Sequence, residues 1–154
     1  MDNQKSDIIY FFLIIFIILA LPFGISAYDR HVWDKRTPKD AKIFDLTGNT
    51  HKGWVLGSID AVDVLTGSLG LKKFNPPVIK VQKGDLVVLK LTSSDVVHGF
   101  SLKDFGVFIN DGIQPGRPRT VSFIANKEGR FTFSCNAICG SYHENMTGTI
   151  IVTA

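Results

Sequence analysis

The chain has 154 residues, the size expected of one small domain with an additional terminal segment. Its 17 Lys and Arg against 14 Asp and Glu give a formal net charge of +3, and these basic residues are scattered, without interleaved aromatic residues. We therefore expect no nucleic-acid partner. The sequence also holds no Cys-x-x-Cys-His haem motif, no nucleotide-binding loop and no hydrolytic triad, so we expect no catalysis by this chain alone.

The first predicted element is the uncharged, largely apolar stretch of residues 8–27. Twenty such residues are about the number that a helix needs to cross the hydrocarbon core of a bilayer. A cleaved signal peptide is the alternative, but Ile25 stands where a second small residue is favoured before a cleavage site. We expect residues 1–27 to be an uncleaved transmembrane anchor, in which Pro22 is tolerated because it is near the end of the helix.

A charged segment, residues 28–42, follows the anchor and contains Pro38, and its composition predicts a linker. From residue 43 onward, short apolar runs alternate with turn signals such as Lys-Gly-Asp and Gln-Pro-Gly. Short strands at this spacing predict an all-β domain, a Greek-key β-sandwich over residues 43–154. The predicted strands are residues 43–46, 54–64, 78–81, 86–91, 100–102, 120–124, 131–135 and 149–152.

The most informative motif lies near the C-terminus, where Cys135, Cys139, His143 and Met146 fall within twelve residues. A further histidine, His98, stands 37 residues before the first cysteine, at the end of an apolar run. Thiolate and thioether ligands select copper, and imidazole also suits it. A blue-copper site uses one Cys, two His and a weak axial Met, so this set holds one cysteine more than a mononuclear site requires. Because two thiolates can bridge two ions, the motif predicts a binuclear copper centre that transfers electrons.

Three other interpretations of the same residues stay open. Two cysteines in an exported domain often form a disulfide, although three intervening residues make an unusually short bridge that leaves the histidines and the methionine without a role. A tetrahedral zinc site would use both cysteines and both histidines but not the methionine. A mononuclear copper site would leave one cysteine spare.

At these residues the chain resembles the cytochrome c oxidase subunit II family, whose CuA-binding loop has the pattern Cys-x-x-x-Cys-x-x-x-His-x-x-Met. The loop matches position by position, and the resemblance covers roughly residues 74–154. The electron-accepting domain of nitrous-oxide reductase carries a similar loop, so the motif specifies the cofactor better than the enzyme. Outside the loop, the resemblance rests on residues 94–100 with the upstream histidine, the turn at 114–117 and the closing strand at 148–152.

The resemblance implies a cupredoxin-like Greek-key β-sandwich with one N-terminal transmembrane helix, and a binuclear CuA centre of two copper ions. The two cysteines would bridge the ions, and one histidine would cap each end. The family often has Glu or Gln at position 137, but copper needs only the backbone carbonyl there, so Ala137 is compatible with the site. The implied metal ligands are Cys135 and Cys139 on both ions, His98 with Met146 on one ion, and His143 with the carbonyl of Ala137 on the other. Candidates for an apolar rim around the site are Phe74, Phe100 and Phe108, for which ordinary core positions are the more frequent alternative.

By the same resemblance, we expect an electron-transfer subunit of a haem-copper terminal oxidase. It would accept electrons from a soluble donor, a cytochrome c or a small cupredoxin, and pass them to a haem-bearing membrane subunit. The alternatives are a CuA subunit of a nitric oxide reductase or related respiratory complex, and a free-standing, membrane-tethered copper carrier. The five basic residues of segment 28–42 favour a cytoplasmic domain by the positive-inside rule, but a CuA domain belongs outside the cytoplasm, and we expect that orientation.

Overall fold

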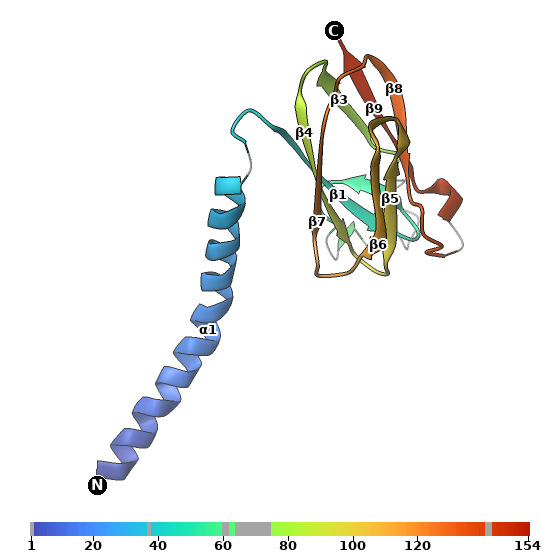
Figure 1. Ribbon diagram of the computed structural model, residues 1–154. Coiled ribbons are helices and arrows are strands. Elements are labelled where there is room, and N and C mark those ends of the chain that lie inside the picture. Colours follow the sequence, from blue (N-terminus) through green and yellow to red (C-terminus); the bar gives the residue numbers. More distant parts are fainter. Residues whose placement is uncertain (1, 37, 60–61, 64–74, 141–142) are drawn as a thin grey trace. The chain divides into compact units, whose positions relative to one another are not determined.

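The computed structural model describes residues 2–36, 38–59, 62–63, 75–140 and 143–154. The chain divides into two compact units, Met1–Lys39 and Asp40–Ala154. The first unit is a single helix and the second is built of β-strands (Figure 1).

Helix α1, Asp2–Arg36, contains the segment Asp7–Tyr28, which by length and composition could cross a membrane. None of this segment is buried within the chain. The helix passes through Pro22 and continues through residues 28–36, which the sequence predicted to belong to a linker. Those residues include no Pro or Gly to interrupt the helix, which ends at Arg36, two residues before Pro38.

The second unit is a sandwich of two sheets, with strand orders β2-β1-β4-β7 and β3-β9-β8-β5-β6 (Figure 1). The pairs β1/β4 and β3/β9 are parallel and the other pairs are antiparallel. The all-β sandwich predicted from the sequence is therefore confirmed. The strands are β1 Lys42–Asn49, β2 Gly53–Leu56, β3 Val78–Gln82, β4 Leu86–Ser93, β5 His98–Leu102, β6 Val107–Ile113, β7 Arg119–Ile124, β8 Gly129–Ser134 and β9 Thr147–Thr153, with short 3-10 helices η1 Lys103–Phe105 and η2 His143–Asn145.

The core between the sheets includes an aromatic cluster of Trp54, Phe100 and Phe133, whose ring centroids lie 5.4 to 6.5 Å apart. Such pairs add about 0.5–1.5 kcal/mol each beyond the burial of their area. Phe100 is fully buried, so this rim candidate takes the core position that was the more frequent alternative: β5 lies between β8 and β6, and every residue of the strand is buried. Phe108 is half exposed on β6, and Phe74 lies outside the described residues.

Two strand predictions differ from the structure. Strand β2 ends at Leu56 rather than continuing to residue 64, because Gly57, whose N–H still donates to the carbonyl of Asp45, adopts a positive φ of 89° that leaves the extended conformation. Strand β6 was not predicted, since its Asn-Asp-Gly sequence is typical of a turn. The structure instead places Gly112, with a φ of 84°, in strand β6, which pairs with β5 through a shift of register, a β-bulge.

Candidate metal centre

The predicted ligands gather at one end of the sandwich. His98 is the first residue of β5, and the other five lie between β8 and β9, in residues 135–146, which we call the metal loop. The backbone N–H of Cys135 donates to the carbonyl of Met146 at 3.0 Å and closes the base of this loop. The β8–β9 pairing thus brings the first and last ligands of the loop together before any side chain is considered.

Both cysteines are free, and their sulfurs lie 3.6 Å apart. A disulfide needs about 2.05 Å between sulfurs, so the short-bridge alternative does not describe this structure. The Cys139 sulfur lies 3.3 Å from Sδ of Met146 and 3.5 Å from Nδ1 of His143. The Cys135 sulfur lies 3.3 Å from the carbonyl oxygen of Ala137. One pair of sulfurs is therefore surrounded by the other donors of the loop.

His98 completes this group from the other side. Its side chain is fully buried, and its Nδ1 has no hydrogen-bond partner among the described residues. Ligand atoms of His98, Cys135 and Cys139 all lie within 4.8 Å of one another. A buried, unpartnered ring nitrogen beside two sulfurs fits a metal ion, and the combination of thiolate, thioether and imidazole fits copper.

The orientation of His98 is set by a carboxylate. Its Nε2 lies 2.8 Å from Oδ1 of Asp95. Burial alone would raise the pKa of Asp95, but hydrogen bonds from the side chain and backbone of Thr50, from His98 and from the backbone of Val96 hold that pKa below its ordinary value. The ionised carboxylate accepts the Nε2 proton, which leaves the lone pair of the imidazole on Nδ1, the nitrogen available to a metal.

The two thiols do not ionise alike. Burial would raise the pKa of Cys135, but the neighbouring imidazole of His98, hydrogen bonds with the backbones of Ala137 and Gly99, and Cys139 lower it to about 6. Burial, together with the neighbouring Cys135, raises the pKa of Cys139 to about 12. The pair therefore loses its first proton more readily than an isolated thiol does and its second less readily, so the positive charge of a bound metal would favour the second thiolate.

Two glycines allow the close packing around the ligands. A Cβ on Gly48 of β1 would lie 2.8 Å from Cδ2 of the His98 ring, and the ring of Trp54 lies 6.2 Å from the same imidazole, centroid to centroid. A Cβ on Gly99 would overlap the side chain of Asn136, and the Gly99 N–H donates to the Cys135 sulfur at 3.3 Å. Both positions let backbone approach the site more closely than any side chain would permit.

The sequence predicted the donors but missed their supports. Asp95 stands three residues before His98, and the general rule that metal-bound histidines donate their second nitrogen to a carboxylate could have found it. Gly48 and Thr50 have no such signal, because they are 50 and 48 residues from His98 in the sequence. Only the fold brings Gly48 against His98 and Thr50 against Asp95.

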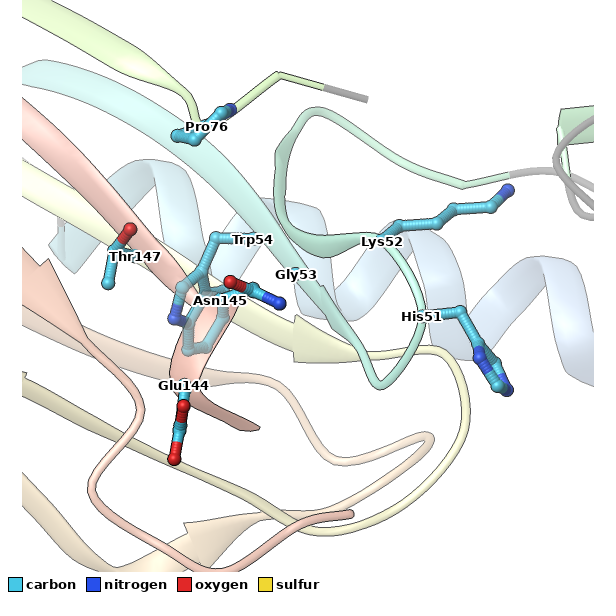
Figure 2. A pocket seen from close by; sticks show the side chains of 8 residues that line it. All are labelled: His51, Lys52, Gly53, Trp54, Pro76, Glu144, Asn145 and Thr147. Atoms are coloured by element: carbon cyan, nitrogen blue, oxygen red, sulfur yellow. The ribbon is translucent and has the colours of Figure 1, made fainter. Parts of the chain in front are cut away.

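A pocket of about 310 Å³ lies beside the metal loop (Figure 2). Its lining includes Glu144 and Asn145, which stand between two predicted ligands, and the buried Trp54, whose indole Nε1 has no hydrogen-bond partner among the described residues. None of the six predicted ligands lines it, so the pocket is separate from the metal centre. The full lining is His51, Lys52, Gly53, Trp54, Pro76, Glu144, Asn145 and Thr147.

The comparisons with known proteins agree with this geometry. The family model of the cytochrome c oxidase subunit II periplasmic domain matches residues 55–154. Cytochrome c oxidase subunit 2 of Thermus thermophilus is 40% identical over 79 residues, which are 51% of this chain and 57% of that protein. A nitrous-oxide reductase of Ralstonia nicotianae is 37% identical over 79 residues, 49% of this chain and 12% of that enzyme.

A solved structure extends the likeness to the fold. The periplasmic domain of cytochrome oxidase subunit II from Bradyrhizobium japonicum matches with a TM-score of 0.53 and 25% identity, covering 75% of this chain and 86% of that one. The sandwich is thus a cupredoxin-like domain with a donor set suited to copper. The chain belongs to the cytochrome c oxidase subunit II family. Its match spans about half the length of the curated Thermus relatives.

Proposed function

We propose that the chain is the electron-transfer subunit of a haem-copper terminal oxidase and that its metal loop and His98 hold a binuclear CuA centre. The observation that carries the proposal is the pair of free sulfurs, 3.6 Å apart, ringed by the buried Nδ1 of His98, Nδ1 of His143 and Sδ of Met146. Two sulfurs so close can serve as shared ligands. A tetrahedral zinc site would leave the thioether without a role, and a mononuclear copper site would leave one cysteine without a role.

Each residue has a part in this proposal. Cys135 and Cys139 would be shared by the two ions, His98 and Met146 would hold one, and His143 with the carbonyl of Ala137 would hold the other. A bound copper pair would supply one-electron transfer, with the charge shared over both ions and both sulfurs. The chain supplies the rigidity: strands β5, β8 and β9 fix the ends of the ligand-bearing segments, and Asp95 fixes the imidazole of His98. A site that changes little in shape between redox states has a low barrier to electron transfer.

The metal loop lies partly at the surface of the domain, so the candidate metal centre is close to solvent. Cys139 and His143 are partly exposed, and the side chain of Ile138 between the two cysteines is 99% exposed. We propose that a soluble donor, a cytochrome c or a small cupredoxin, delivers electrons at this domain, and that a haem-bearing membrane subunit receives them. Helix α1 would anchor the chain in the membrane, with the copper domain on the extracytoplasmic side, as befits a family whose matched domain is periplasmic.

The nuclearity of the site is the first property to measure. The full chain, purified in detergent and loaded with copper, should bind two coppers and give an electron paramagnetic resonance spectrum split by two equivalent copper nuclei. Cys135→Ser should lose this spectrum, because an alcohol oxygen is a poor bridge for copper. Ile138→Ala, which changes an exposed non-ligand in the same loop, is the matched control and should keep it.

Other outcomes would point elsewhere. One copper with a localised signal, or a silent cuprous site, would replace this proposal with a membrane-tethered copper carrier. A spectrum unchanged by Cys135→Ser would refute the bridging role. The partner is tested separately: haem that co-purifies with the full chain from its own membranes, and oxygen consumption by that complex, would support the oxidase, whereas nitric oxide consumption alone would favour a nitric oxide reductase.

A further inference from the structure

The turn between β1 and β2, residues 49–53, touches both segments that carry the predicted ligands. The backbone N and Oγ1 of Thr50 each lie 2.6 Å from Oδ2 of Asp95, the carboxylate that holds His98. On its other side, Cγ2 of Thr50 lies 3.4 Å from the place that a Cβ would take on Gly140, which follows Cys139 in the metal loop. Thr50 therefore bonds the support of one ligand, and its methyl group faces the residue next to another.

The turn is fixed without help from the site. The Asn49 side-chain oxygen accepts hydrogen bonds from the backbone N–H groups of His51 and Lys52 at 3.1 Å each. The Asn49 amide donates to Oγ of Ser94 at 3.0 Å, and the Ser94 N–H donates to the carbonyl of Gly48 at 3.1 Å. An asparagine that bonds its own backbone in this way stabilises a turn in one conformation. The turn therefore holds Thr50 in position to bond Asp95.

The carboxylate of Asp95 has little freedom to rotate. Its Oδ2 accepts both bonds from Thr50, and its Oδ1 accepts from the Val96 N–H at 2.8 Å and from Nε2 of His98 at 2.8 Å. Because the Thr50 bonds hold Oδ2 of Asp95, its Oδ1 keeps its position opposite Nε2 of His98. The imidazole ring then keeps Nδ1 directed at the cysteine sulfurs. Loss of the Thr50 hydroxyl would leave Oδ2 with a single backbone donor.

We propose that Thr50, acting through Asp95, is a positioning residue for the copper ligand His98, and that the β1–β2 turn ties this ligand to the metal loop. The proposal rests on the copper binding proposed above. Thr50 lies outside residues 55–154, so the family match does not assign it this role. It touches no predicted ligand directly and acts only by fixing the carboxylate that Nε2 of His98 bonds.

The test uses three variants of the full chain in detergent. Thr50→Val keeps the shape and removes the hydroxyl, and Thr50→Ser restores the hydroxyl without the methyl group. Thr47→Val is the matched control, because Oγ1 of Thr47, in β1, bonds the carbonyl of Gly57 at 2.6 Å and Oγ1 of Thr92 at 3.0 Å and makes no bond to Asp95. We expect Thr50→Val to retain copper about tenfold less well against a competing chelator, the lower end of the range for such outer partners, and to shift the reduction potential. Thr50→Ser and Thr47→Val should match the unsubstituted chain in potential and spectrum.

A second measurement is made on metal-free protein, so that it decides the proposal even if copper binding fails. Nuclear magnetic resonance of labelled histidine should give one set of His98 ring signals in the unsubstituted chain and in Thr47→Val, and doubled or exchange-broadened signals in Thr50→Val. Unchanged His98 signals, or a Thr50→Val potential equal to that of the unsubstituted chain, would overturn the positioning role. A chain that binds no copper but shows the doubled signals would refute the proposed function and leave the positioning of His98 intact.

Discussion

At the scale of single residues, the site is unequally supported on its two sides. The imidazole of His98 is fully buried, contacts the bare backbone of Gly48, packs near Trp54 and bonds Asp95. His143 is only partly buried, and its Nδ1 approaches the sulfur of Cys139 at 3.5 Å. The side of the site nearest the strands is therefore fixed by the fold, whereas the side formed by the loop depends more on the bound metal.

Met146 offers the clearest test of an individual ligand. Its side chain is fully buried, with Sδ 3.3 Å from the Cys139 sulfur. Met146→Leu replaces the thioether with a side chain of similar volume, and we expect a loss of stability below about 1.5 kcal/mol. Under the proposed assignment of Met146 as a weak axial ligand, two coppers should remain while the reduction potential shifts. The measurements are copper content, potentiometry and thermal unfolding; loss of both coppers in a stably folded variant would count against an axial role.

At the scale of elements, the sequence predicted the strands whose apolar pattern is unbroken. It missed the strand and the supporting residues whose positions depend on contacts between distant segments of the chain. Strands β3, β4, β7, β8 and β9 were located to within a few residues, because alternation and turn residues bound them. Strand β6 was missed, since its bulge is imposed by pairing with β5. The six predicted ligands came from the Cys-His-Met motif and the family resemblance, which alone supplied the carbonyl of Ala137. Asp95 could have been found from its place three residues before His98, whereas Gly48 and Thr50 became evident only from the packing of β1 and the turn that follows it.

The β8–β9 hairpin carries the metal loop, and its packing depends on Gly148. A Cβ at this position would overlap the ring of Phe133, a buried member of the aromatic cluster of Trp54, Phe100 and Phe133. We expect Gly148→Ala to destabilise the sandwich by about 1–3 kcal/mol, the usual cost of overpacking a core. Gly24→Ala, at a glycine with nothing within 4 Å, is the matched control. Denaturant unfolding measures both variants, and equal midpoints would show that Phe133 moves aside at little cost.

At the scale of the whole molecule, the proposed copper-binding domain extends beyond residues 55–154, the segment that the family model matches. The match begins at residue 55, but β1 lies before it, supplies the fully buried Leu46 to the core and forms the centre of one sheet between β2 and β4. The same strand brings Gly48 against His98. A fragment that began at the family boundary would lose a central strand and one wall of the site, so we expect it neither to fold nor to bind copper as the full chain does.

The fate of helix α1 decides whether the β-sandwich domain stays anchored to a membrane or is released from it. The segment Asp7–Tyr28 passes the length and composition test for a membrane span, which a signal sequence also passes. An uncleaved anchor predicts that the chain isolated from cells has its full mass and stays with membranes after carbonate extraction. Ile14→Arg with Ile18→Arg should release it, because each arginine at the centre of a span costs about 3 kcal/mol, whereas Ile14→Leu with Ile18→Leu should remain bound. Mass spectrometry decides between the two origins of the segment: a mature chain that begins after Ala27 would mean that the copper domain is exported and set free.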